Sequence, residues 1–162
     1  EVDRAEARAD QKTIGTYGEW TAFTDEENGK PLCYIGSAPK KAEGAYTSRG
    51  ATYVLVSIRP AEASNGVVTV EAGYSYKPDS KVNVDIDGTK YELYTRNRDN
   101  DKKGDAWAVG DDGDKALITA MKSGKTMVVK GTSSRGTLTT DTYSLAGFTA
   151  AYDAIDRAFK SG

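Results

Sequence analysis

The sequence contains no histidine and only one cysteine, Cys33. Without histidine, no Ser-His-Asp or Cys-His system can form and no imidazole can transfer protons near neutral pH or bind a metal. A single cysteine also excludes thiolate zinc sites and disulfides within the chain. We therefore expect no catalytic residues, no cofactor and no metal site, and we predict that the protein is not an enzyme.

Long apolar runs and a surplus of charge of one sign are also missing. No stretch of about 18 apolar residues is present, so we expect no transmembrane segment. The 22 basic and 24 acidic residues give a net charge of -2. A nucleic-acid-binding protein needs a concentrated basic surface, and this charge balance does not indicate one. The chain begins with Glu1, which is typical of a processed or recombinant product. We expect that a signal peptide has been removed from an exported protein.

A length of 162 residues fits one domain with its own core. Residues 1–16 begin with the run EVDRAEARADQK, which mixes both charges and has almost no bulky apolar side chains. Such a segment has little to bury, so we predict a flexible charged tail over residues 1–16 and a single β-sandwich domain over residues 17–162.

From residue 17 onward, apolar side chains recur mainly with a period of two, which is typical of strands. Residues 81–95 (KVNVDIDGTKYELYT) give the clearest signal, because Asp87-Gly88 between two alternating runs favours a type I′ hairpin turn. The implied facing pairs are Val82 with Leu93, Val84 with Tyr91, Asp85 with Lys90 and Ile86 with Thr89. This register puts the apolar side chains on one face and Asp85 and Lys90 on the other.

The period changes to that of a helix in only two places. Asp114 is a candidate N-cap of a short internal helix, in which Leu117 and Met121 are four apart and Gly124 provides the stop. A stripe with helical spacing closes the chain, formed by Phe148, Ala151, Tyr152, Ile155 and Phe159. Many short strands with a single internal helix favour a mainly β, antiparallel sandwich over a parallel α/β sheet.

Two loops resemble functional motifs but lack necessary residues. Residues 99–105 (DNDKKGD) partly resemble the start of a calcium-binding loop. However, Lys103 occupies the fifth position, where an oxygen ligand is needed, and Gly110 occupies the twelfth, where a bidentate Glu is needed. Residues 131–137 (GTSSRGT) lack both a nucleophile elbow and a phosphate-loop lysine. We interpret the second segment as a polar connection between two strands.

Four cations in loops are the candidate partner-binding residues. Lys40, Lys41 and Arg49 flank the loop between two predicted strands, and Arg135 lies in the polar connection. Pairing of the flanking strands would bring the first three to one end of the sandwich, where loops gather. The alternative is ordinary solvated loop charge.

Tyrosine is unusually frequent, with 10 residues against 3 Phe and 2 Trp. Tyr74, Tyr76, Tyr91 and Tyr94 fall in or near predicted strands. Tyrosine is enriched in interfaces, but it also has a high strand propensity, so both partner binding and sheet packing remain open.

Cys33 lies in a short apolar strand, and the alternation places it on the same face as Ile35. We predict a buried, unreactive thiol, because burial disfavours the thiolate; an interchain disulfide is the alternative.

A series of short motifs resembles the invasion-associated locus B family of exported proteins from Gram-negative bacteria. In chain order they are residues 33–40 (CYIGSAPK), 49–50 (RG), 72–74 (AGY) with Lys77, 106–107 (AW), 120–124 (AMKSG), 131–137 (GTSSRGT) and 141–151 (DTYSLAGFTAA). The resemblance extends from about Trp20 to the C-terminus.

This resemblance implies an immunoglobulin-like β-sandwich in the periplasm or secreted, with no established catalytic residues. Family members often carry a cysteine near the end of the last helix; here Phe159 follows residues 154–158, so a disulfide to the Cys33 strand is not expected. We expect a non-enzymatic module that binds a protein or a cell-envelope component. The alternatives are a hydrolase that uses two carboxylates and a self-associating structural component of the envelope.

Overall fold

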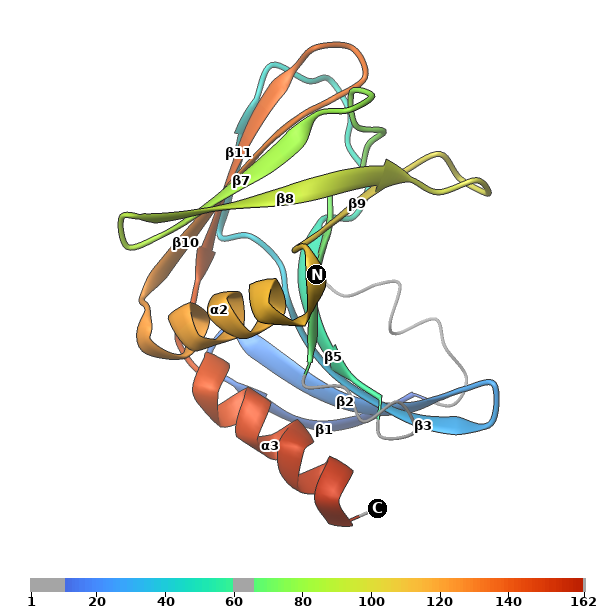
Figure 1. The fold of residues 1–162 in the computed structure, drawn as a ribbon, viewed down its shortest axis with the longest axis vertical. Helices are drawn as coiled ribbons and strands as arrows, with labels where there is room; N and C mark the ends of the chain where they lie inside the picture. Colours follow the sequence, from blue (N-terminus) through green and yellow to red (C-terminus); the bar gives the residue numbers. More distant parts are fainter. Residues whose placement is uncertain (1–10, 60–65, 162) are drawn as a thin grey trace.

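The computed structural model describes residues 11–59 and 66–161, with side chains described as far as residue 158. Eleven strands and two helices occupy this part of the chain (Figure 1). The strands are β1 (Lys12–Tyr17), β2 (Trp20–Glu27), β3 (Lys30–Ser37), β4 (Lys41–Gly44), β5 (Tyr53–Ile58), β6 (Val67–Glu71), β7 (Lys81–Ile86), β8 (Thr89–Asn97), β9 (Gly104–Trp107), β10 (Thr126–Thr132) and β11 (Leu138–Ser144). The helices are α2 (Gly110–Ser123) and α3 (Phe148–Ser161).

All strand pairs are antiparallel, in the order β1-β2-β3-β5-β6-β9-β8-β7-β10-β11-β4. The sheet bends between β5 and β8, so that its two halves lie around a common core (Figure 1). Ile35 of β3 and Met127 of β10 belong to the same buried cluster. The expected mainly β, antiparallel class with one internal and one C-terminal helix is confirmed, and the sandwich consists of one continuous, folded sheet.

The predicted hairpin is formed by β7 and β8 with the expected register throughout. Asp87 and Gly88 have φ values of 49° and 97°, as a type I′ turn requires. Val84 is buried and Lys90 is exposed, whereas Asp85 and Tyr91 are half-buried. Tyr91 therefore packs at the margin of the core rather than inside it.

The internal helix α2 begins earlier than the sequence predicts. Val109 is its N-cap, no side chain caps it, and Asp114 lies inside the helix. Asp114 is 8% exposed, and its Oδ1 accepts a hydrogen bond from the backbone N–H of Val68 at 3.0 Å. The predicted N-cap role is thus wrong: this carboxylate attaches α2 to β6. Gly124 follows the last helical residue as its C-cap, as expected.

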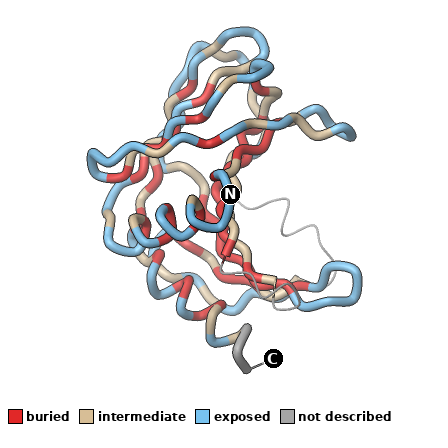
Figure 2. Tube along the Cα trace, in the orientation of Figure 1, coloured by how far each residue is buried: buried red, intermediate tan, exposed pale blue. Residues whose placement is uncertain are grey.

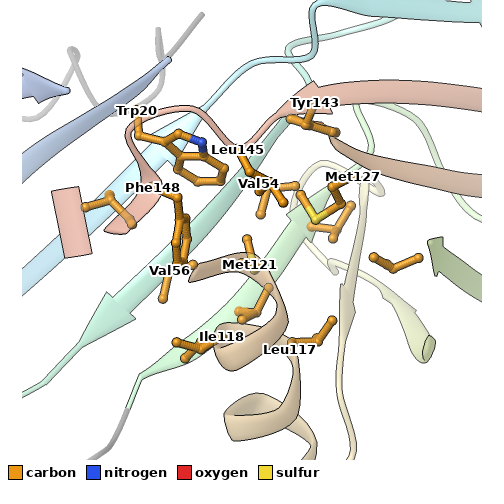
Figure 3. Packing of buried hydrophobic residues seen from close by; sticks show 14 of the residues in the cluster. Trp20, Val54, Val56, Leu117, Ile118, Met121, Met127, Tyr143, Leu145 and Phe148 are labelled. Carbon is orange, nitrogen blue, oxygen red and sulfur yellow. The ribbon is translucent and has the colours of Figure 1, made fainter. Parts of the chain in front are cut away.

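The terminal helix α3 packs against β1, β2, β3 and β5. Phe148, Ala151, Tyr152 and Ile155 are buried, as the stripe predicts; the side chain of Phe159 lies outside the described residues. The rings of Phe148 and Trp20 meet edge to face, with centroids 5.0 Å apart. Figure 3 shows this pair beside apolar side chains of β5 and α2. Buried positions follow the inner faces of the strands and helices, while hairpin tips are exposed (Figure 2).

The sheet begins within the segment predicted to be a tail. β1 pairs with β2, so the boundary after residue 16 is too late by five residues. Edge strand β1 has mostly exposed side chains and is held by backbone pairing, which explains why apolar periodicity did not reveal it. Residues 1–10 of the predicted tail lie outside the described residues.

Candidate functional site: a hydroxyl-lined groove

The structure places the four candidate cations in three different environments. Lys40 and Lys41 are exposed beside Glu19 and Glu43, with Nζ–Oε distances of 3.2 and 3.4 Å. Lys41 pairs with Thr142 of β11. Thr142 lies four residues beyond Leu138, the first residue of that strand, which is about 13 Å at ~3.3 Å per residue. Arg135 lies beyond that first residue, in the β10–β11 turn.

The Arg49 side chain is buried rather than presented at the surface. Its Nη1 and Nη2 each donate a 2.7 Å hydrogen bond to one carboxylate oxygen of Asp141, and the two side chains are 6% and 4% exposed. Its Nε donates a third bond to the carbonyl of Ala72 at 2.8 Å. Burial alone would lower the pKa of Arg49, but the hydrogen bonds and charge of Asp141 outweigh it and raise the pKa. Arg49 therefore acts as a structural residue that joins β11 to the end of β6.

Two tyrosine rings cover the Arg49 guanidinium. Its Cζ lies 5.4 Å from the ring centroid of Tyr46 and 4.9 Å from that of Tyr74, within the range of cation–π contacts. The Tyr74 hydroxyl is hydrogen-bonded to Thr139 Oγ1 at 2.6 Å, and burial raises the pKa of Tyr74. A Cβ on Gly131 would lie 2.8 Å from the Tyr74 hydroxyl, so a glycine is needed beneath this ring. These contacts fix the position of Tyr74.

A groove of about 470 Å³ adjoins this arrangement, between the β4–β5 loop, the segment after β6 and the β10–β11 turn. The β10–β11 turn itself is at the top of Figure 1. We call this groove the hydroxyl groove, because nine of its eleven lining residues carry a hydroxyl group. Its lining consists of Ala45, Tyr46, Thr47, Ser48, Tyr74, Ser75, Ser133, Ser134, Arg135, Thr137 and Thr139. Arg135 is the one charged residue among them.

A tight turn presents Arg135 at the groove. Ser133 Oγ accepts hydrogen bonds from the backbone N–H groups of Arg135 at 3.3 Å and Thr137 at 3.1 Å, and Gly136 has a φ of 85°. The Ser134 N–H donates to the Ser75 carbonyl at 2.7 Å, which joins the turn to the opposite wall. The expected connection between two strands is confirmed over residues 133–137, whereas Gly131 and Thr132 belong to β10. Hydrogen bonds support the backbone of this turn.

Other grooves offer less as binding sites. A groove of about 590 Å³ lies between α2 and the β7–β8 hairpin. Its carboxylate, Asp87, already accepts backbone hydrogen bonds from Lys125 and Thr126, at 2.8 and 3.2 Å. A third groove lies over β7, β8 and β10 and contains Asp85. Since neither groove brings two carboxylates together and the hydroxyl groove has none, these sites do not provide the carboxylate pair of the hydrolase alternative.

The acidic loop near residue 100 is organised around an arginine. Arg98 lies 3.0 Å from Asp101, 2.7 Å from Asp105 and 3.9 Å from Glu71. The hydrogen bond from Arg98 lowers the pKa of Asp101 to about 2, which is opposite to the shift that a general acid needs. Within residues 11–59 and 66–161, no cluster of His, Cys, Asp and Glu could hold a metal ion.

The predicted tyrosines have different environments. Tyr76 is 2% exposed and packs in the core, and Tyr74 forms part of the groove. Tyr94 is 40% exposed on the outer face of the sheet, where its ring lies 5.6 Å from that of Trp107. The groove tyrosine that the sequence analysis missed is Tyr46; it lies in a loop, and no local pattern marks it.

Cys33 is buried and shares the core cluster with Ile35, so the predicted strand phase is confirmed. Burial raises the pKa of its thiol. The neighbours Leu32 and Tyr34 are also buried, in a second cluster on the other face of β3.

Fold and site together define a small antiparallel β-sandwich with a preformed polar groove at one end. The family model described as "Invasion associated locus B (IalB) protein" matches residues 20–156, and the chain belongs to this family. The crystal structure of invasion associated protein B from Bartonella henselae is similar, with a TM-score of 0.66 and 20% sequence identity. The match covers 93% of this chain and 99% of the other, and it shows a shared fold. No curated protein matches significantly.

Proposed function

We propose that this protein is an exported, non-enzymatic module that binds a protein or a cell-envelope component in the hydroxyl groove. The invasion-associated locus B family is an exported bacterial family, which supports a periplasmic or secreted location. No helix among the described residues is long and apolar enough to cross a bilayer. The groove itself is the observation on which the proposed binding role rests.

Binding is favoured because the walls of the groove are already in place. The buried Arg49–Asp141 pair fixes the floor, and backbone hydrogen bonds fix the turn that carries Arg135. A preorganised site loses less conformational entropy when its ligand binds. Its volume of about 470 Å³ lies in the ~300–1,000 Å³ range of small-ligand sites, so it suits a side chain or a small group of a larger partner.

The same lining argues against catalysis. A serine or threonine nucleophile needs an adjacent general base, and the groove contains neither a carboxylate nor a lysine. The guanidinium of Arg135 has hydrogen-bond donors but no acceptor, so it cannot serve as that base. These side chains can donate and accept hydrogen bonds, which is what recognition requires.

Site-specific photo-crosslinking in the native host tests the proposal. A crosslinker at Thr47 or Ser134, both exposed in the groove, should capture one discrete species. The same crosslinker at exposed positions away from it, Lys90 and Arg157, should not. Equal capture at all four positions would contradict a groove-specific partner. Recovery of only the protein itself would instead favour the self-associating envelope component.

A further inference from the structure

We infer that the hydroxyl groove recognises an acidic saccharide, meaning a sugar ring that carries a carboxylate or phosphate group. This inference rests on the proposed binding function and specifies its ligand. It depends on three properties of the lining: hydroxyl groups that have no side-chain hydrogen bond to the described residues, one cation that forms no ion pair with them, and a fixed aromatic wall.

Several hydroxyl groups in the groove are free to bind a ligand. Within the part of the chain that the structure describes, the side chains of Thr47, Ser48, Ser134 and Thr137 form no hydrogen bond. Each hydroxyl can donate one hydrogen bond and accept two. Such a lining matches the hydroxyl groups of a sugar, which also act as both donor and acceptor, better than it matches an apolar ligand.

Arg135 supplies the charge selectivity. Arg49, Arg59 and Arg98 each hold a carboxylate. Arg135 is exposed and forms no ion pair with any residue in the ranges 11–59 and 66–161. The groove has no carboxylate of its own, so its formal charge is that of this one guanidinium. A guanidinium binds carboxylate or phosphate through charge-assisted, often bidentate hydrogen bonds.

Two tyrosines, Tyr46 and Tyr74, line the same groove as Arg135. The Tyr46 and Tyr74 rings are held against the Arg49 guanidinium, and Tyr74 is further fixed through Thr139. Tyrosine combines an apolar ring with a polar tip, which suits the apolar face and polar rim of a pyranose. An inorganic anion would use Arg135 and leave this wall without a contact, so the saccharide is the ligand that engages all three properties.

Titration of the full chain, followed by backbone amide NMR shifts, tests this inference with four probes: glucuronate, glucose 6-phosphate, glucose and inorganic phosphate. We expect both acidic sugars to shift resonances of the groove and to bind at least tenfold more tightly than glucose or phosphate. Arg135→Gln should weaken both acidic sugars at least tenfold, and the matched control Arg157→Gln, on the exposed side of α3, should not. Equal thermal stability of the two variants would show that the fold is retained.

Each contrary result overturns a defined part of the inference. Binding of glucose as tight as that of glucuronate, or an unaffected Arg135→Gln variant, would contradict acidic recognition. Phosphate as tight as glucose 6-phosphate would reduce the groove to a simple anion site. If no probe shifts the amide resonances of the groove residues, the inference that the groove binds a saccharide is wrong. Groove-specific crosslinking would still support the proposed function in that case. Preference for the phosphorylated sugar would indicate a phosphorylated glycan as the source, and preference for glucuronate a uronate polymer.

Discussion

The buried pair of Arg49 and Asp141 allows a sharp test of what holds the groove end of the sandwich together. Replacing Asp141 by Ala would leave a guanidinium that is 6% exposed without a counter-charge. Replacing Arg49 by Met would leave the carboxylate of Asp141 unpaired and would also remove the hydrogen bond to Ala72 O. Asp141→Ala is the cleaner of the two variants, because Arg49→Met also removes the contacts of the guanidinium with the Tyr46 and Tyr74 rings.

The size of the effect follows from burial. Removal of one partner of a buried ion pair costs about 3–5 kcal/mol, because the remaining charge stays desolvated. For a chain of this size, a loss of 1 kcal/mol lowers the melting temperature by roughly 2–4 °C. We therefore expect each single variant to melt about 6–20 °C below the native protein. Replacing both partners with apolar residues removes the unpaired charge, so the double variant Arg49→Met/Asp141→Ala should be more stable than either single variant.

Urea unfolding monitored by tryptophan fluorescence, together with thermal circular dichroism, measures these differences. The exposed pair Lys40–Glu19 is a matched control: its side chains are 56% and 40% exposed, and Lys40→Met should change stability by less than about 1 kcal/mol. A loss below about 1 kcal/mol for Asp141→Ala would refute the reasoning. Strictly additive effects of the two single substitutions in the double variant would refute it as well.

Three further predictions concern other parts of the fold. Ile155→Asp places a carboxylate at a fully buried position of α3, which should cost several kcal/mol and lower the melting temperature by more than about 10 °C. An unchanged melting temperature would contradict the docking of α3 on the sheet. Cys33 should hardly react with a thiol reagent in the native protein and should consume about one equivalent after denaturation. Fast labelling of the native protein would contradict its burial. Burial raises the pKa of Asp114 above its unfolded value of 3.8, so protonation favours the folded state. As the pH rises through 3.8 and then through the higher pKa of Asp114 in the folded state, the free energy of unfolding of the native protein should fall relative to that of Asp114→Asn. Paired urea titrations measure this difference, and a difference that stays constant with pH would contradict the prediction.

Local patterns were sufficient for the elements whose side chains alternate between core and solvent. The β7–β8 register and the α3 stripe both depend on spacing within about 15 residues, and the turn at Asp87-Gly88 depends on backbone preference alone. The edge strands β1 and β4 were not predicted, because their side chains are mostly exposed and leave no apolar period. Backbone pairing to a neighbouring strand forms them.

The site could be predicted only in outline. Arg49 and Arg135 are both loop cations in the sequence, and nothing local separates them. The partner of Arg49 is 92 positions away, and that distant carboxylate makes its burial possible. Asp114 is similar: it looks like a cap, and its acceptor role depends on Val68, 46 positions away. Gly131 was the usable signal, since a glycine within a strand often marks the close approach of another group, here Tyr74.

The two arginines should therefore have separable effects. Arg49 is neutralised by Asp141 and buried, so its loss should lower stability while contributing no net charge to the groove. Arg135 is exposed on a turn held by backbone hydrogen bonds, so its loss should leave the melting temperature unchanged while weakening acidic ligands. A stability defect in Arg135→Gln would mean that its guanidinium supports the fold. Retention of acidic-sugar binding in that variant would mean that charge selectivity has another source in the protein.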